Sequence, residues 1–487
     1  MVRGLLAALS AALGIAVSLA APGVAAAKDG FVVGAVEDHV RASSLVEVES
    51  RMQLLRVSGF RTVRVTSYWR PGLTRLSEGE RDALERIATA GSRNGVRVFV
   101  TVMHPGSPTT PSTDEARAEF ASYAADLVRT TPALRDVIVA NEPNLNRFWL
   151  PQFDASGASA APAAYLALLA RTYDALKAVS PAVRVYGGAV SPRGTDRPDG
   201  IRPTHSPTRF IEGLGVAYRA SGRTRPVMDS FVMHPYGDNS SQPPSTAHPN
   251  TTTIGVADYD KLVALLAAAF DGTEQPGSDL PILYGEYGVE SEIPPEKASL
   301  YTGTEPATTR PVPEETQAAY YEQALALAYC QPNVEGFLVF LSRDERARAT
   351  WQSGVFYVDG EPKSSLPRVR RALDRAFGGS IARCPNVQLV VRPTLLRFGT
   401  RASARRGVFR ASFRCNLDCA YRVRLENAAT GSTRLARRGL APAGELIQVD
   451  LGPRRLGQGA YRYTIRLVHP VNPAPPTIRL GPRFRIP

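Results

Sequence analysis

The strongest constraint on the fold is an alternation of short β-type runs with segments of helical spacing, repeated eight times before residue 381. Two of the helical segments open on capping-box patterns, Ser77-x-x-Glu80 and Ser112-x-x-Glu115. Eight strand–helix units in roughly 350 residues predict an α/β fold, a (β/α)₈ TIM barrel. The alternative is an open doubly wound sheet, but the glycine-rich phosphate turn typical of such sheets is missing. The predicted strands are Phe31–Val36, Thr62–Thr66, Arg97–Met103, Asp136–Ala140, Arg184–Ala189, Asp229–Met233, Pro281–Gly285 and Val334–Leu341.

The connections between these units differ in length. Those that lead from a helix into a strand are short, as at 91–95 and 130–135. Those that leave the strands are long and rich in Pro, Gly, Ser and Thr: 105–113, 143–162, 191–207, 237–257 and 289–313. In a barrel of this type the segments that follow the strands gather at one face and build the functional site. We therefore expect a cleft at that face.

The last hundred residues differ in composition from the rest. From Val387 to Pro487 there are 19 Arg, no Lys and four acidic residues, a net charge of +15, whereas the remainder of the chain carries −2. Apolar and polar residues alternate strictly in Tyr421–Glu426 and Tyr461–Leu467, the period of a strand with one buried face. Residues 386–487 are therefore expected to form a C-terminal all-β, immunoglobulin-like sandwich.

The arginines of this tail fall on the solvent-facing phase of the alternation, so a solvated face is the simplest interpretation. The functional alternative is weak contact with anionic envelope polymers. We expect no nucleic-acid partner.

The N-terminus has the pattern of a secretory signal peptide. Arg3 precedes the apolar run Leu5–Ala21, and Ala25–Ala27 forms an A-x-A cleavage site. An uncleaved anchor helix is the alternative, but the run is short for that. We predict that residues 1–27 are removed, that residues 28–385 form the barrel domain, and that the mature protein is secreted or associated with the cell envelope, without a transmembrane segment.

Export makes disulfide bonds feasible for the four cysteines. Cys415 and Cys419 bound a short loop that one bridge can close, which leaves Cys330 with Cys384 by elimination. A metal site is the alternative, but no histidine cluster lies near either pair. The sequence predicts two disulfides and no metal.

Two glutamates stand at strand ends on opposite sides of the predicted barrel. Glu142 follows the fourth strand in Asn141-Glu142-Pro143, and Glu286 follows the seventh in Tyr284-Gly285-Glu286. A single glutamate at a strand end is usually solvated or salt-bridged. Two carboxylates across one barrel mouth are the groups that split a glycosidic bond by acid/base and nucleophilic catalysis.

With His234-Pro235-Tyr236 at the sixth strand, these motifs resemble the retaining glycoside hydrolases of clan A, TIM-barrel glycosidases that include families 5 and 39. The resemblance covers roughly residues 28–380. An Asn-Glu-Pro motif with a second Glu about three strands later is specific for the clan, but it indicates no single family or substrate.

This resemblance implies that Glu142 is the general acid/base and Glu286 the nucleophile. It also implies that Asn141 contacts the sugar 2-hydroxyl and that Tyr236 hydrogen-bonds the nucleophile. Donors such as Tyr236 and Arg64, on the second strand, would favour an ionised nucleophile.

Three of the six histidines, His39, His104 and His234, follow the first, third and sixth strands. Capping of the strand end through a backbone hydrogen bond is the simplest role for each. No His-x-His or His-Glu-x-x-His spacing indicates a metal. Contacts with sugar hydroxyls are the functional alternative, and no cofactor is expected.

All three tryptophans fall in connections on the expected open face: Trp69 after the second strand, Trp149 after the fourth and Trp351 after the eighth. Flat aromatic faces there would stack on pyranose rings, with Tyr68 and Phe148 as partners. Core packing is the alternative for any tryptophan.

The sequence thus favours a secreted retaining glycoside hydrolase that cleaves a polysaccharide or oligosaccharide by double displacement. The first alternative is a catalytically weak or inactive carbohydrate-binding protein of the envelope on a degenerate barrel. The second is a structural envelope protein. Both glutamates are accompanied by Asn141 and Tyr236, which argues against a decayed site.

Overall fold

In the computed structural model, the described residues are 28, 30–381, 393, 395–403, 407–416, 419–442, 444–452, 456–468 and 477–486. The predicted signal peptide, the predicted domain boundary at 385/386 and Cys384 lie outside them.

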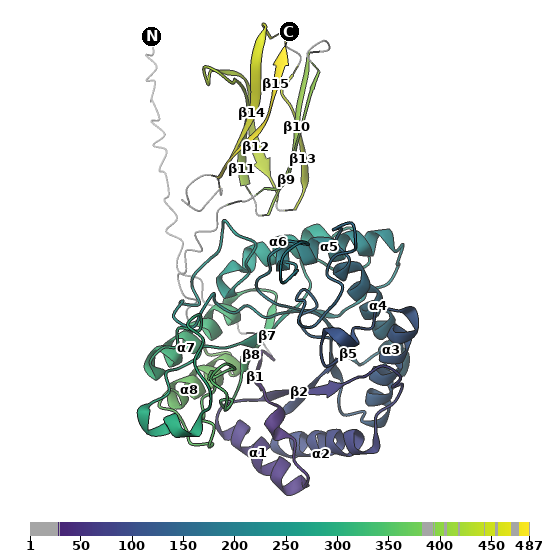
Figure 1. The fold of residues 1–487 in the computed structure, drawn as a ribbon, viewed down its shortest axis with the longest axis vertical. Helices are drawn as coiled ribbons and strands as arrows, with labels where there is room; N and C mark the ends of the chain where they lie inside the picture. The colour runs from purple at the N-terminus through teal and green to yellow at the C-terminus, as the bar shows by residue number, and fades with distance from the viewer. Residues whose placement is uncertain are drawn as a thin grey trace, which may run out of the picture.

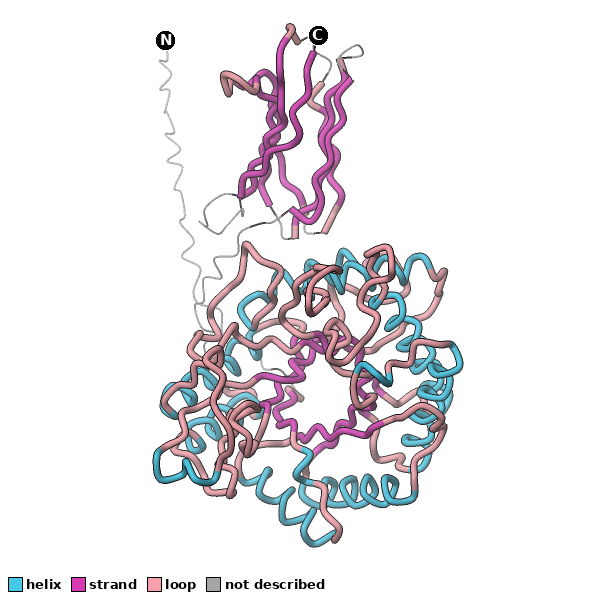
Figure 2. Tube along the Cα trace, in the orientation of Figure 1, coloured by secondary structure: helices cyan, strands magenta, loops and turns pink. Residues whose placement is uncertain are grey.

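Eight parallel strands pair in chain order, and β8 pairs with β1 to close a barrel that a ring of helices surrounds (Figures 1 and 2). The strands are β1 (Val32–Val36), β2 (Thr62–Tyr68), β3 (Arg97–Met103), β4 (Asp136–Val139), β5 (Arg184–Val190), β6 (Ser230–Met233), β7 (Ile282–Tyr287) and β8 (Val334–Phe340). The helices are α1 (Leu45–Val57), α2 (Glu78–Asn94), α3 (Asp114–Thr130), α4 (Ala161–Val179), α5 (Pro207–Ala220), α6 (Tyr259–Phe270), α7 (Glu314–Cys330) and α8 (Leu366–Phe377). Four 3₁₀ turns are η1 (Asp38–Val40), η2 (Ser107–Thr109), η3 (Val256–Asp258) and η4 (Pro295–Leu300). The predicted TIM barrel is confirmed.

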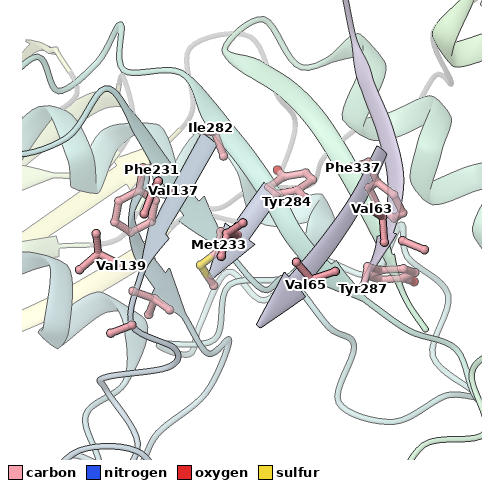
Figure 3. Close-up of a cluster of buried hydrophobic side chains, with 14 of the residues drawn as sticks. Val63, Val65, Val137, Val139, Phe231, Met233, Ile282, Tyr284, Tyr287 and Phe337 are labelled. Atoms are coloured by element: carbon pink, nitrogen blue, oxygen red, sulfur yellow. The ribbon is translucent and has the colours of Figure 1, made fainter. Parts of the chain in front are cut away.

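Strand alternation builds two apolar layers. Val63 and Val65 of β2 and Phe231 and Met233 of β6 face the helices and belong to the main core (Figure 3). Residues of opposite parity turn into the barrel and fill it: Val32, Phe99, Ile138, Tyr186, Val232, Leu283 and Leu338. Because both faces of the strands are covered, the strands read as nearly continuous apolar runs.

One predicted helix start is confirmed and one is wrong. Ser77 is the N-cap of α2, and its side chain accepts a hydrogen bond from the Glu80 amide. The N-cap of α3 is Thr113 rather than Ser112, because Thr113 has the extended backbone of a cap and its side chain accepts from the Ala116 amide.

The tail forms an antiparallel β-sandwich, as predicted. Its strands are β9 (Leu395–Ser403), β10 (Val408–Cys415), β11 (Cys419–Asn427), β12 (Thr433–Ala441), β13 (Leu446–Asp450), β14 (Gly459–Val468) and β15 (Thr477–Ile486). One sheet has the order β13-β10-β9, and the other has the order β12-β11-β14-β15. The disulfide Cys415–Cys419 is confirmed, and Cys330 is also disulfide-bonded. No helix in the described segments is both long and apolar enough to cross a bilayer.

Close approach inside the barrel yields a stability prediction at Gly34. A Cβ there would lie 2.5 Å from the Thr62 carbonyl oxygen and 2.8 Å from Leu338 Cδ2. Gly34→Ala should therefore lower the free energy of unfolding by about 1–3 kcal/mol through overpacking. The control is Gly79→Ala in the first turn of α2, where an added methyl group meets nothing within 4 Å. The control should raise stability by about 0.5–1 kcal/mol. Urea unfolding measures both, and equal stabilities would contradict the packing argument.

Candidate active site

The barrel mouth brings together polar side chains from four strands. Glu286 of β7 accepts a hydrogen bond on Oε1 from Arg64 of β2, at 2.8 Å from Nη1, and on Oε2 from the Tyr236 hydroxyl, at 2.9 Å. Arg64 Nη2 also donates to Asn141 Oδ1 at 3.0 Å, next to Glu142 at the end of β4. Tyr236 and Arg64, which were predicted to lie against Glu286, therefore do contact it.

A β-bulge aims Glu286 into the mouth. Ile282 and Tyr284 point toward the helices and Leu283 into the barrel, so simple alternation would turn Glu286 outward. The pairing of β7 with β8 shifts between Tyr284 and Tyr287, so that one extra residue stands on β7. Tyr287 then packs in the outer core, and Glu286 is free to face Arg64.

Glu142 stands on a strained backbone that its neighbours hold in place. Its φ is 40° and that of Ala140 is 67°, both in the left-handed region. The Glu142 amide donates to the Ala189 carbonyl oxygen at 2.8 Å, and the Ala140 amide donates to that of Val102 at 2.8 Å. Bonds to β3 and β5 therefore fix the direction in which the Glu142 side chain leaves the strand.

Asn144 secures the segment that follows Glu142. It is fully buried, and its side-chain nitrogen donates to the carbonyl oxygens of Ser191, at 3.2 Å, and His205, at 3.0 Å. Its Oδ1 accepts from the Ser191 amide at 2.9 Å. The sequence analysis assigned Asn144 no role. Its side-chain amide stands three residues after Asn141, and that position at the end of a strand could have indicated a role in holding the segment.

His234 lies beneath the two carboxylates and has no exposed surface. Its Nδ1 is 3.2 Å from Glu142 Oε1 and 3.5 Å from Glu286 Oε2, and its Nε2 is 3.5 Å from Arg64 Nη1. Because the guanidinium can only donate, Nε2 is the ring nitrogen that can accept from Arg64, and Nδ1 is the one that can donate to the carboxylates. The expected contact of His234 with sugar hydroxyls is therefore corrected to contacts with the glutamates.

One carboxylate oxygen of Glu142, one of Glu286 and a ring nitrogen of His234 lie within 4.8 Å of one another. Such a trio has the spacing of metal ligands, but the chemistry of its surroundings fits a cation poorly. The Arg64 guanidinium, permanently charged, already lies 2.8 Å from Glu286. A metal ion would have to share that carboxylate with it.

Burial and charge set the state of Tyr236. Its burial, together with the nearby charges of Glu286 and Glu142, raises the pKa of this phenol well above its usual value. Tyr236 therefore remains a hydrogen-bond donor to Glu286 at any physiological pH.

Glu142, Glu286 and the Arg64, Asn141 and Tyr236 side chains around them line a cavity of about 470 Å³ at the barrel mouth. Trp351 forms part of its wall, with its ring centroid 4.8 Å from that of Tyr236 and 5.4 Å from that of Phe340. The half-exposed His39 and the aromatic rings of Tyr68 and Phe148 also line the cavity. These placements agree with the predicted substrate-binding set, whose contact with a sugar stays a prediction.

Besides His234, three more residues predicted to contact substrate do not reach the cavity. Trp69 is fully buried against Phe120, and its indole nitrogen donates to the Leu73 carbonyl oxygen. Trp149 is fully buried beside His104, and the His104 ring pairs with the Gly106 carbonyl oxygen. The expectation that Trp69, Trp149 and His104 contact a sugar is therefore corrected. A loop at the open face of the barrel can still turn its large side chains inward onto the core.

The cavity also contains Glu37, directly after β1, which sequence reasoning passed over although it ends a strand as Glu142 does. Glu37 Oε1 is 2.7 Å from His39 Nδ1, and Oε2 accepts from the Ser342 hydroxyl. Burial raises the pKa of Glu37, but these bonds outweigh it and the pKa falls below its usual value. A further carboxylate, besides those of Glu142 and Glu286, therefore stands at the edge of the site.

The segment bearing Trp351 is anchored by a buried ion pair. Lys363 Nζ donates to Asp344 Oδ1 at 2.8 Å and to the Gln352 carbonyl oxygen at 3.1 Å, next to Trp351 in sequence. The Tyr301 hydroxyl donates to Asp344 Oδ2 at 2.7 Å. The pair therefore ties the wall of the cavity to the barrel.

Removing one partner of this pair should be costly. Asp344→Asn leaves the Lys363 ammonium buried without its counter-charge and should lower the free energy of unfolding by about 3 kcal/mol. Asp359→Asn is the control, because Asp359 pairs with Lys297 at the surface, and it should change stability little. Urea unfolding compares the two, and similar stability losses would contradict the anchoring role.

The buried carboxyl group of Glu290 makes the stability of the folded protein depend on pH. Burial raises the pKa of Glu290 to about 8, with added repulsion from Glu305 and Asp344 and partial compensation by the Gln352 amide and Lys363. The folded protein therefore holds a proton that the unfolded chain releases near pH 4.5. This contribution to stability is complete below that pH and is lost as the pH rises toward 8.

Glu290→Gln should accordingly flatten the decline of stability between about pH 5 and about pH 9, and it should unfold at a higher temperature than wild type at the alkaline end. Thermal unfolding at several pH values measures this. Glu115→Gln, an exposed site on α3, is the control and should follow wild type. Parallel profiles for Glu290→Gln and wild type would rule out a buried protonated carboxyl.

No protein-family model matches this chain, and neither does any curated protein sequence. Among solved structures, the endo-β-1,4-mannanase from Thermotoga petrophila is 13% identical, with 93% of this chain and 97% of that chain covered and a TM-score of 0.44. GH5_18 from Streptomyces cattleya in complex with GlcNAc is 14% identical, with 72% and 80% covered and a TM-score of 0.47. The calcium binding mutant of Bacteroides uniformis β-glucuronidase 2 is 12% identical, with a TM-score of 0.45. The match covers 94% of this chain but only 45% of that longer protein. The assignment of the fold rests on the strand pairing itself.

Proposed function

We propose that this protein is an exported glycoside hydrolase that cleaves O-glycosidic bonds with retention of configuration. The observation that carries the proposal is the approach of Glu142 and Glu286, whose nearest carboxylate oxygens lie within 4.8 Å. Retaining enzymes hold their two carboxyl groups about 5–5.5 Å apart, whereas inverting enzymes leave room for a water molecule between them.

The hydrogen-bond partners divide the roles between the carboxylates. Glu286 accepts from Arg64 and Tyr236, so negative charge is stabilised on it, and it serves as the nucleophile. Among the described residues Glu142 has the His234 ring at 3.2 Å but no such pair of donors, and it serves as the general acid. In this proposal Asn141, whose Oδ1 accepts from Arg64, contacts the sugar 2-hydroxyl.

In the first step a Glu286 oxygen forms a bond to the anomeric carbon as the bond to the leaving oxygen breaks, and Glu142 gives its proton to that oxygen. In the second step Glu142 takes a proton from water, the water oxygen attacks the anomeric carbon, and the bond to Glu286 breaks. Two displacements at one carbon restore its configuration.

The surroundings support a carbohydrate substrate. Trp351, Tyr68 and Phe148 line the cavity with aromatic surface, which packs against the C–H faces of sugar rings. The N-terminal signal pattern supports export, and a secreted enzyme of this kind would meet polysaccharides or their fragments.

Substitution of either carboxylate tests the proposal. Glu286→Gln and Glu142→Gln should each reduce turnover of activated aryl glycosides roughly a thousandfold or more. Azide should restore the activity of a Glu286→Ala variant by taking the place of the missing nucleophile. For the wild-type enzyme, NMR of the product first formed should show the same anomeric configuration as the substrate. Glu115→Gln is the matched control and should keep wild-type turnover. A wild-type protein that binds glycans but is as inert as both variants over a broad panel would establish the carbohydrate-binding alternative instead.

A further inference from the structure

Three arginines lie side by side across the four-stranded sheet of the sandwich. The register pairs Arg438 of β12 with Arg422 of β11, and Arg422 with Arg466 of β14. Their sequence neighbours Val423 and Ile465 are buried in the sandwich core, so the arginines occupy the opposite, outer face. Neighbouring strands are about 4.8 Å apart, which makes this a row of closely spaced positive charges.

Such a row opposes folding, because like charges directly across a sheet destabilise it. Within the described strands, no ion pair compensates any of the three. Some other arginines of the sandwich do have a counter-charge. Glu426, further along the same sheet, lies 3.5 Å from Arg424 and 4.0 Å from Arg462.

On the other sheet the same compensation is seen. Arg410 stands directly opposite Asp450, and Nε lies 3.2 Å from Oδ2. The row therefore lacks the counter-charge that Arg424 and Arg462 have on the same sheet, and it is open to an external anion.

An apolar strip runs beside the row. Leu440, Ala420 and Val468 pair across the same three strands, two residues from the arginines and on the same face. Leu440 is 72% exposed, and the arginines and this strip together line a hollow of about 750 Å³. The face therefore offers guanidinium groups and apolar surface in parallel.

We infer that the outer face of β12, β11 and β14 binds an acidic polysaccharide, with the carboxylates of successive sugars on the arginine row and C–H faces of the rings on the apolar strip. Guanidinium groups form paired hydrogen bonds with carboxylates. A glycan fits better than a nucleic acid because the outward side chains beside the row are aliphatic, and the one ring that lines the hollow, Tyr421, packs edge-on against Phe413 rather than offering a free face to a base. The choice of a carbohydrate also rests on the proposed function, but the binding itself needs no catalysis.

The test compares two double variants of the full-length mature protein. Arg422→Gln with Arg466→Gln removes two charges from the row, and Arg397→Gln with Arg401→Gln removes two exposed charges from β9. Binding to polygalacturonate, with neutral glucan as a reference, is measured by calorimetry at about 0.15 M salt. The row variant should bind at least about tenfold more weakly than wild type, and the β9 variant should bind within about twofold.

Thermal unfolding supplies an independent readout. The row variant should unfold at the same temperature as wild type or a higher one, because its substitutions relieve repulsion. A lower unfolding temperature, or equal loss of binding in both variants, would overturn the assignment.

Tighter binding of duplex DNA than of polygalacturonate would replace the polysaccharide with a nucleic acid. Glu286→Gln should bind the polymer as wild type does, and loss of binding there would place the polymer in the barrel instead. Inactivity of the wild-type enzyme toward glycosides would leave this comparison unaffected.

Discussion

A single buried guanidinium organises the mouth of the barrel. Arg64 is almost fully enclosed, and it contacts Glu286, Asn141, the Thr101 hydroxyl and the Gly285 carbonyl oxygen. A charge at this depth is tolerated only because a carboxylate and neutral acceptors meet it from several strands. The same contacts place the two glutamate-bearing strands in fixed relation. The geometry on which the proposed chemistry depends is therefore also the condition for burying the arginine.

Much of the barrel follows from local pattern. All eight strands lie where apolar runs predicted them, and the strand-end residues Glu142, Tyr236 and Glu286 converge because parallel strands end at one face. Spacing could not predict the direction of side chains in the loops, since that depends on tertiary contacts. Trp69 and Trp149 turned out to be core residues for this reason, while Trp351, held by the Lys363 anchor, reaches the cavity.

In the sandwich, too, the sequence predicted which way side chains face but not which of them meet. Alternation in the sequence predicted which tail residues face outward, and charge counting showed that many are arginine. Neither could show that Arg438, Arg422 and Arg466 meet in one row, because that depends on the register between strands far apart in the chain. A composition that suggests only a solvated face becomes a specific arrangement once the pairing is known.

The extra residue in β7 makes residue count, rather than residue type, critical in that strand. If the same residues paired regularly with β8, without the irregularity between Tyr284 and Tyr287, every side chain beyond Tyr284 would turn to the other face of the strand. Glu286 would then stand among the apolar side chains beneath the helices, and the Tyr287 ring would stand in the mouth. Anyone transplanting this strand into another barrel must carry its irregularity along with its amino acids.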